Sequence, residues 1–498
     1  MERLLVIRTM ADLALRLPTT HAAATGASDG ASCRSGTGDR TCTVVLPTPA
    51  DQGVPPQIAA AFEDLARDNL VHAPTTSLPH TLHEVLNSRA SERTELLAEQ
   101  LRSPDPATRH DAIRMTRNLI ASWRGDHTRH LLLLADCLLP HDPYTAAAAA
   151  EALGSMAAVA EPAREPLASY VTANRTTHGH DAWASPHPLL RRAHQEAVLA
   201  LATLGDERSL PDLLTALDAD TDAWRVVNVA DRLPTAAPQL VPRLIRRLAS
   251  AEVSANRPDF SVNGLASALA ALGDTSAAPV LTDTLRAAVR HKQWRTAAHV
   301  LGALASFGPL AATALATIRP LADAEDVDLR AAATVALWDL ERSPADSVPR
   351  LRLLLDTHRD LDAVEVLGRI GPPTAAALPH LRKMLDDQDP WTRVHSATAL
   401  WKMGGAAHAG VVVHTLLRAW QDNDATSTQV LTCLNSMGEA ARPALPRLRE
   451  ALARTRCGGP SWGGIGPDEE QQSACRALLT RLQSPPDQTP PDQTPPER

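Results

Sequence analysis

A motif of about 35 residues recurs along most of this chain of 498 residues, and it constrains the fold more than any other feature. Segments that open with an Asp-like helix cap and continue as an apolar helix include DPATRHDAIRMTRNLI from Asp105 and DPWTRVHSATALWKMGG from Asp389. The motif starts again 37 residues after Asp105, at Asp142, and 35 residues after Asp389, at Asp424. Such spacing predicts a string of similar helical units.

A second helix with a Pro-Leu signature precedes each Asp-led helix. Examples are LPDLLTAL at 210–217, VPRLRLLL at 348–355 and LPHLRKML at 378–385. Proline is tolerated near a helix start, where its missing N–H group is not needed. Each unit therefore reads as helix A, an Asp-led turn, helix B and a Gly-rich turn. One helix pair cannot bury its own apolar face, so we expect the pairs to stack on their neighbours.

The composition favours helices throughout. Aromatic residues make up only 3% of the chain, and Ala and Leu supply most of the apolar residues. Both are strong helix formers, and long runs of Val, Ile, Thr and Tyr that would indicate strands are missing. The sequence therefore predicts an all-α protein.

The unit LPHLRKMLDDQDPWTRVHSATALWKMGG, which ends at Gly405, resembles a HEAT repeat of the bacterial type grouped with phycobilin-lyase HEAT-like repeats. The resemblance extends over residues 101–482 and recurs about eleven times. It implies an all-α fold, an α-solenoid of about eleven HEAT-like helix pairs that form a right-handed superhelix. Because such repeats serve many roles, the resemblance alone does not specify a function.

The two ends of the chain differ from the repeats. We expect residues 1–50 to form a mostly disordered N-terminal segment, because residues 18–50 are rich in Thr, Ala, Ser and Gly. Residues 51–100 are expected to form a helical N-terminal cap, followed by the solenoid over 101–482. Residues 483–498 repeat PPDQT and are expected to form a Pro-rich disordered tail.

Charged pairs recur at equivalent positions of the units. Asp389 and Arg393 are four residues apart, as are Asp326 and Arg330. An Asp at a helix start can accept the free N–H groups there and favours the helix dipole. The Arg can reach that carboxylate or the one in the next repeat. We interpret these pairs as structural, with Leu400 and Met403 on the buried face of the same helix.

Two insertions interrupt the regular spacing. The distance from Pro166 to His187 and the distance from Pro446 to Pro467 are both 21 residues, where 10 or 11 is usual. Loops added to one side of a repeat array often bind partners. The first insertion, 172–187, carries His178, His180, Asp181 and Trp183, and the second, 457–467, carries Trp462. The His-rich stretch could hold a metal, but no further ligand at fixed spacing is visible, so a partner-contacting loop is preferred and no metal is predicted.

Tryptophan is the most frequent aromatic residue, with nine Trp against two Tyr and three Phe. Trp224, Trp294 and Trp391 lie near the start of helix B, while Trp338 and Trp401 lie inside it and are expected in the core. In HEAT arrays the B helices line the concave side. The first three could pack over the turn of the adjacent repeat or form a partner-binding set. Our candidate partner-binding residues are Trp224, Trp294, Trp391, His178, His180, Trp183 and Trp462.

The residue content argues against the enzyme classes that use this fold. His83-Glu84 is the only His-Glu dipeptide, whereas HEAT-like hydroxylases carry several to hold a di-iron centre. The six cysteines form no CxxC pair, and no Gly-rich phosphate loop, GxSxG or HExxH motif occurs. We therefore predict no catalysis and no cofactor. The net charge of −8 argues against a general nucleic-acid binder.

The sequence thus predicts a non-catalytic scaffold or adaptor that binds a protein or peptide on the concave face. The alternatives are a nucleic-acid-associated or nucleic-acid-modifying HEAT-like protein with a DNA-glycosylase-like groove, or a lyase-like HEAT protein. A continuous Arg stripe on the concave face would favour nucleic acid, and a mixed or acidic face would favour protein. Arg8, Asp12 and Arg16 interrupt the apolar N-terminus, so no signal peptide, no membrane segment and a cytoplasmic location are expected.

Overall fold

The computed structural model describes residues 90–253, 260–358, 361–458 and 464–483. The chain divides into two compact units, residues 1–115 and 116–498, with the boundary inside one helix. The described part of the first unit contains α4 (Ala90–Leu101) and the start of α5 (Pro106–Ser122). The predicted disordered segment 1–50, most of the predicted cap 51–100 and the tail after Gln483 lie outside the described residues.

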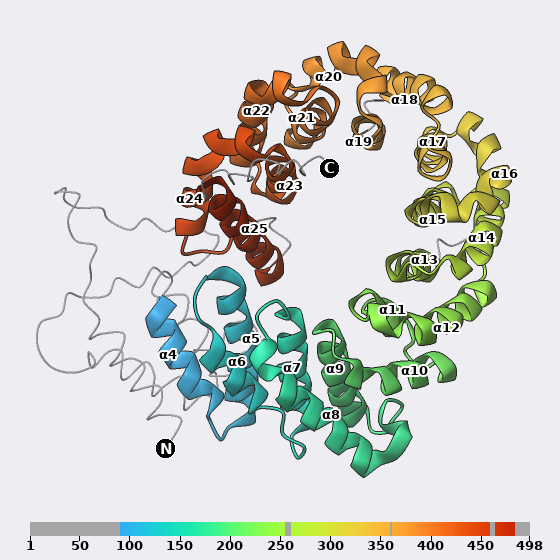
Figure 1. The fold of residues 1–498 in the computed structure, drawn as a ribbon. Coiled ribbons are helices and arrows are strands. Elements are labelled where there is room, and N and C mark those ends of the chain that lie inside the picture. The colour runs from blue at the N-terminus through green and yellow to red at the C-terminus, as the bar shows by residue number, and fades with distance from the viewer. Residues whose placement is uncertain (1–89, 254–259, 359–360, 459–463, 484–498) are drawn as a thin grey trace, which may run out of the picture. The chain divides into compact units, whose positions relative to one another are not determined.

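The second unit is a solenoid of helix pairs, and over the described residues it contains no strand, in agreement with the all-α prediction. Its helices form two rows (Figure 1). The outer row consists of α6 (Thr128–Ala135), α8 (Arg164–His178), α10 (Leu210–Ala219), α12 (Ala237–Ser250), α14 (Ala278–Arg290), α16 (Leu315–Ile318), α18 (Pro344–His358), α20 (Leu378–Met384), α22 (Ala409–Asp422) and α24 (Leu445–Ala453). The inner row consists of α7 (Pro143–Ser155), α9 (Pro188–Thr203), α11 (Trp224–Val227), α13 (Phe260–Leu272), α15 (Trp294–Ser306), α17 (Val327–Glu341), α19 (Leu361–Ile370), α21 (Pro390–Gly404), α23 (Ser427–Met437) and α25 (Ile465–Gln483).

Short 3₁₀ helices shape many of the turns between the rows. They are η2 (Glu161–Ala163), η3 (Gly179–Ala182), η4 (Glu207–Ser209), η5 (Ala230–Arg232), η6 (Pro234–Ala236), η7 (Thr275–Ala277), η8 (Gly308–Ala314), η9 (Arg319–Asp323), η10 (Pro372–Ala377), η11 (Gly405–His408), η12 (Asp424–Thr426) and η13 (Gly438–Ala444). Many of them lead directly into an outer-row helix, as η10 leads into α20.

Some inner-row helices begin at the predicted caps, but α23 does not, since Asp424 is the first residue of η12 and the N-cap of α23 is Thr426. The carboxylate of Asp389 accepts the backbone N–H of Thr392 at 2.8 Å, and that of Asp326 accepts the N–H of Leu329 at 2.9 Å. Each bond satisfies one of the N–H groups that a helix start leaves without a partner, and is worth roughly 1 kcal/mol. The capping role predicted for these Asp residues is confirmed.

Arginines four residues after the caps bridge to neighbouring chain segments. Arg393 is buried, and its Nη2 lies 2.5 Å from Oδ2 of Asp422 in the next repeat. Arg330 instead donates to the carbonyl of Ala324, at 2.8 Å, in the turn before its own helix. The predicted link to the next repeat is therefore present at Arg393, while Arg330 stays within its own turn.

The core lies between the rows and between successive inner helices. Leu400 and Leu416 have no exposed surface, and Met403 is 8% exposed, as predicted for the buried face of α21. Each such side chain contributes about 1.5–3 kcal/mol through burial. Small residues let the inner helices approach closely, since a Cβ at Gly368 would lie 2.8 Å from Cα of Ala399.

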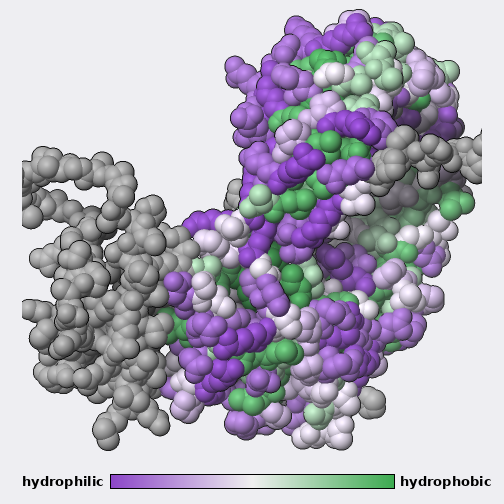
Figure 2. Space-filling view, turned by 60° about the vertical axis from the view of Figure 1, so that its left-hand side comes forward, coloured by the Kyte–Doolittle hydropathy of each residue, from purple (hydrophilic) through white to green (hydrophobic). Residues whose placement is uncertain are grey.

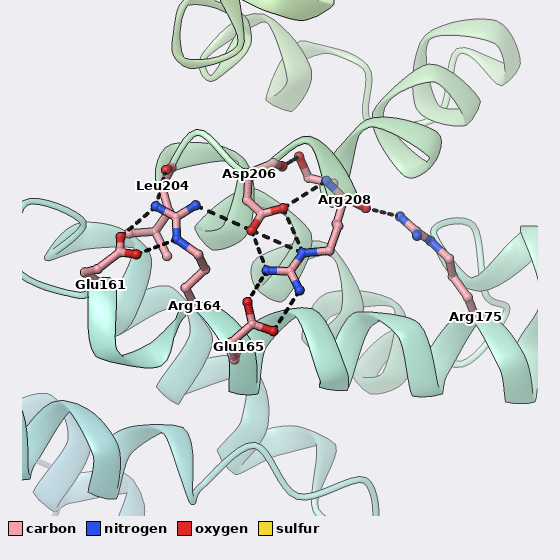
Figure 3. A network of polar contacts seen from close by, with 8 residues as sticks. Glu161, Arg164, Glu165, Arg175, Leu204, Asp206 and Arg208 are labelled. Atoms are coloured by element: carbon pink, nitrogen blue, oxygen red, sulfur yellow. Dashed lines mark hydrogen bonds and ion pairs between the residues drawn. The ribbon is translucent and has the colours of Figure 1, made fainter.

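An ion-pair network fastens α8 to the turn before α10 (Figure 3). The carboxylate of Asp206 lies between two guanidinium groups, with Nη2 of Arg208 at 2.6 Å and Nη1 of Arg164 at 3.4 Å. Arg208 also contacts Glu165 through two hydrogen bonds, of 2.9 and 2.7 Å. The hydrogen bonds from Arg208 lower the pKa of Asp206 to about 2, although burial opposes this.

Replacing Asp206 by Asn is therefore expected to destabilise the protein by roughly 1–2 kcal/mol at neutral pH, allowing for solvent around the half-exposed Arg208. A depressed carboxyl pKa stabilises the fold above its ordinary value, and this contribution is lost as the pH falls towards 2. Urea unfolding of both proteins should thus give curves that differ at pH 7 and converge near pH 2. A constant difference across this range would contradict the assignment.

Candidate functional site

The three tryptophans predicted to bind a partner all lie in the first turn of an inner-row helix. Trp224 opens α11, Trp294 opens α15 and Trp391 is the second residue of α21. Trp224 is 59% exposed, whereas Trp294 and Trp391 are partly buried. Because every inner helix follows an outer helix that runs the opposite way, the inner helices run in one direction and their first turns share one edge. We call these first turns the inner-row edge.

The turns before α11 and α15 have the same unusual geometry. Asp222 and Lys292, each two residues before the tryptophan, have φ values of 51° and 56°. This left-handed conformation costs a non-glycine residue roughly 1 kcal/mol. Its repetition places Trp224 and Trp294 in equivalent positions, as their matching sequence positions suggested.

Two further apolar residues occupy this edge. Tyr144, second in α7, is 49% exposed, and Leu189, second in α9, is 51% exposed. Sequence reasoning did not select either of them. The signal was present for Tyr144, since Asp-Pro-Tyr at 142–144 matches Asp-Pro-Trp at 389–391. The edges of α7, α9 and α11 thus carry one exposed apolar residue each.

The edge is extended and does not form one pocket. Neighbouring helices pack about 8–10 Å apart, so Trp224 and Trp294, separated by α13, lie roughly 20 Å from each other. Trp391 lies roughly 30 Å further along, because α17 and α19 intervene. Exposed carboxylates, those of Asp328 and Asp362, occupy the second positions of α17 and α19. Two successive acidic positions therefore separate Trp391 from the apolar residues on the earlier helices of the edge.

Arginines of the inner row are paired with acceptors on the preceding repeat. Arg225 donates to Glu196 at 2.6 Å and to Gln195 at 2.8 Å. Arg192 reaches Glu151 at 3.1 Å, and Arg369 contacts Asp339 at 2.6 and 3.0 Å. The charge on this face is mixed, and these guanidinium groups do not form an unpaired basic stripe. On the side of the molecule shown in Figure 2, apolar residues likewise form separate patches among hydrophilic ones.

The first insertion packs against its own array. It extends α8 as far as His178 and continues through η3. Trp183 has no exposed surface, and its indole N–H donates to the carbonyl of Thr221 at 2.8 Å. Trp183 therefore packs between repeats. The prediction that it binds a partner is wrong, because a buried ring offers no surface to a partner.

The structure places the side chains of only some histidines of this insertion. His178 is exposed, and the side chain of His180 lies outside the described residues. No group of three or more His, Cys, Asp or Glu residues placed to hold a metal occurs in the part of the chain that the structure describes. His178 remains a candidate contact residue on the solvent side of the turn.

Residues at the start of the second insertion contact a chain segment that is far away in the sequence. Trp462 lies outside the described residues. Arg456 forms an isolated β-bridge with Trp123, and the N–H of Cys457 donates to the carbonyl of Ser122 at 3.0 Å. These contacts lie within the second unit, and no sequence pattern indicated them.

The sequence did not indicate a buried cluster of ionisable side chains that the structure shows. Asp212 and His194 are 3% and 2% exposed, and His194 Nε2 lies 3.0 Å from Asp212 Oδ1. Arg175 Nε donates to the other oxygen of Asp212 at 2.7 Å. Burial alone would raise the pKa of Asp212, but the hydrogen bonds from His194 and Arg175 outweigh it and lower that pKa. Each of the three helices α8, α9 and α10 contributes one residue to this buried cluster, so its polar contacts hold the helices together.

Two cavities lie between successive helix pairs. One of about 420 Å³ opens among α15, α17 and α19, where Asp339, Arg342, Asp362, Glu365 and Arg369 line it. The other, of about 550 Å³, lies beside α17 and α18. Arg319 and Arg350 line it and are paired with Glu341 at 2.8 Å and with Asp323 at 3.4 Å. Both walls mix acids and bases, which suits polar side chains better than an apolar cofactor.

Comparison with known proteins agrees with the repeat assignment. The family model described as PBS lyase HEAT-like repeat matches residues 194–219, which span most of α9, η4 and all of α10. A comparison with curated proteins gives no match. No helix in the described ranges has the length and apolarity needed to cross a bilayer.

Solved structures with similar chains include the complex of CpcE and CpcF of phycocyanin lyase from Nostoc sp. PCC7120, at 19% identity and a TM-score of 0.30, covering 59% of this chain and 94% of that one. The karyopherin Kap121p bound to the extreme C-terminus of the protein phosphatase Cdc14p is 14% identical with a TM-score of 0.35 and covers 96% of this chain. A Kap121p mutant is 15% identical with a TM-score of 0.34 and covers 84%. This chain spans about half the length of the Kap121p chains, 50% and 53%.

Proposed function

We propose that this array of HEAT-like repeats is a non-catalytic scaffold that holds an extended segment of a partner protein along the inner-row edge. The observation that carries this proposal is the exposure of large apolar side chains at equivalent positions, from Tyr144 through Leu189 to Trp224. Exposed aromatic residues on a rigid framework are the usual anchors of protein interfaces. Stacked repeats provide that framework, because each repeat is held by its neighbours.

The spacing of the anchors sets how many residues of an extended partner would lie between successive contacts. An extended chain advances about 3.3 Å per residue, so roughly six residues would connect the contacts at Trp224 and Trp294. Roughly nine more would reach Trp391. Asp328 and Asp362 lie between the last two anchors, which favours basic residues in that part of the partner.

Nucleic acid fits this edge less well. Phosphate binding needs lysine or arginine side chains that are free to neutralise the backbone. Arg192, Arg225 and Arg369 are already paired with acceptors of the adjacent repeat. Carboxylates at the edge would repel phosphates, so the mixed charge supports a protein partner.

The test is a comparison of two triple variants in a tagged pull-down from native cells, followed by affinity measurement with the purified captured protein. Trp224→Ala, Trp294→Ala and Trp391→Ala together remove three anchors. A single hot-spot truncation costs about 2 kcal/mol and such costs are not additive, so the three changes together should lower the affinity at least about 100-fold. The matched control replaces Leu310, Leu353 and Val411 by Ala. Their side chains are 77%, 61% and 46% exposed and lie away from the inner-row edge, so this variant should bind with unchanged affinity.

Two results would overturn the proposal. One is a partner that binds both triple variants as tightly as the unmodified protein. The other is capture that disappears on nuclease treatment, which would establish the nucleic-acid alternative instead.

A further inference from the structure

The first residues of the second unit are bound to its last repeat by a buried ion pair. Nε and Nη2 of Arg124 lie 2.8 and 2.6 Å from the two carboxylate oxygens of Asp468, in α25. The side chains are 8% and 0% exposed. A two-point pair of this kind is geometrically specific, and it joins positions 344 residues apart in the sequence.

Asp468 has enough partners to remain charged when buried. Besides Arg124, its carboxylate accepts the N–H of Gly458 at 2.6 Å and the amide of Gln472 at 2.8 Å. Burial by itself would raise the pKa of Asp468, but these hydrogen bonds lower it below its usual value. The carboxylate thus connects α25, the second insertion and Arg124.

Backbone contacts reinforce the same junction. The N–H of Arg124 donates to Thr455 O at 3.0 Å, and the N–H of Cys457 donates to Ser122 O at 3.0 Å. The guanidinium of Arg456 lies 4.7 Å from the centre of the Trp123 ring. Arg124 Nη1 also donates to the carbonyl of Ala451, at 2.6 Å, in the last turn of α24. A cation there is favourable because a helix end leaves carbonyls without partners.

This junction differs in kind from the seams between neighbouring repeats. Those seams combine polar pairs, such as Arg369 with Asp339, with apolar clusters, such as the one that joins α21 to α25 through Leu400, Leu416, Leu434 and Leu478. That cluster includes no residue from positions 116–135. The contacts described above for the junction are one ion pair, several hydrogen bonds and one cation–π contact. Opening the junction therefore exchanges these polar contacts for contacts with water, and it leaves the residues of that apolar cluster together.

We propose that residues 122–124 together with residues 451–458 and Asp468 form a reversible latch. The latch closes the array of the second unit on itself, and it opens as a local event while the repeats remain folded. Opening gives an extended partner a path to the inner row that does not require it to thread a closed array. The latch stands on its own contacts and does not depend on the identity of any partner.

Amide hydrogen exchange of the full-length chain, combined with small-angle X-ray scattering, tests this proposal. In Arg124→Ala the amides of Arg124 and Cys457 should exchange at least 10-fold faster. The radius of gyration should increase, and the far-ultraviolet circular dichroism should remain unchanged. Arg456→Ala, at an exposed position, removes only the contact with Trp123 and should accelerate the same amides by a few-fold.

The matched control is Arg369→Ala. Arg369 also makes a two-point pair with a buried carboxylate, that of Asp339, but between neighbouring repeats. This variant should leave the amides of Arg124 and Cys457 protected. The latch is refuted if Arg124→Ala leaves both amides protected and the radius unchanged. It is equally refuted if exchange rises to the same extent in α13 to α21, since the junction would then only support global stability.

Discussion

Replacing Trp183 by Ala is expected to destabilise the repeats around it by about 3–5 kcal/mol, the cost of removing a large buried aromatic side chain. The ring has no exposed surface, and the indole N–H donates to Thr221 O. Its loss leaves a cavity and an unpaired carbonyl. Because solenoids unfold in parts, urea unfolding should be followed together with hydrogen exchange in α9 and α10.

Trp224→Ala is the matched control for Trp183→Ala. Trp224 is 59% exposed, so its truncation should change the free energy of unfolding by no more than about 0.5 kcal/mol. The pair separates a ring used for packing from a ring available to a partner. Equal losses of stability in the two variants would show that Trp224 is also a packing residue, and the inner-row edge would lose its most exposed anchor.

The second large effect is expected for Asp212→Ala. This change leaves His194 buried without its acceptor and removes the partner of Arg175, so a loss of about 3–5 kcal/mol is expected. A lowered carboxyl pKa stabilises the fold above the ordinary value and ceases to do so as the pH falls through the lowered value. The difference between Asp212→Ala and the unmodified protein should therefore shrink in strong acid.

Asp218→Ala provides the comparison for Asp212→Ala. Asp218 forms its ion pairs with Arg243 and Arg246 at the surface, where such pairs contribute about 0–1 kcal/mol. Thermal and urea unfolding should detect little change for this variant. A loss as large as that of Asp212→Ala would mean that burial does not control the effect, contrary to the interpretation of the His194–Asp212–Arg175 cluster.

The repeat architecture could be predicted from the sequence because its determinants are local. A cap such as Asp389 and the apolar positions Leu400 and Met403 act within one helix, and their period is visible along the chain. Recurrence then distinguishes a structural Asp/Arg pair from a catalytic one. The position of Trp224, Trp294 and Trp391 near the start of helix B followed from the same alignment.

Exposure and long-range pairing were decided only by the tertiary structure. Trp183 and Trp224 look alike in the sequence, yet one is buried against Thr221 and the other is exposed, because burial depends on the neighbouring repeat. The contact between Arg124 and Asp468 depends on the small rotations that accumulate over all the repeats between them. The local period of the sequence does not encode this accumulated rotation. The sequence by itself therefore determined the repeating unit, and only the packing of the units determined which distant segments make contact and which side chains stay exposed.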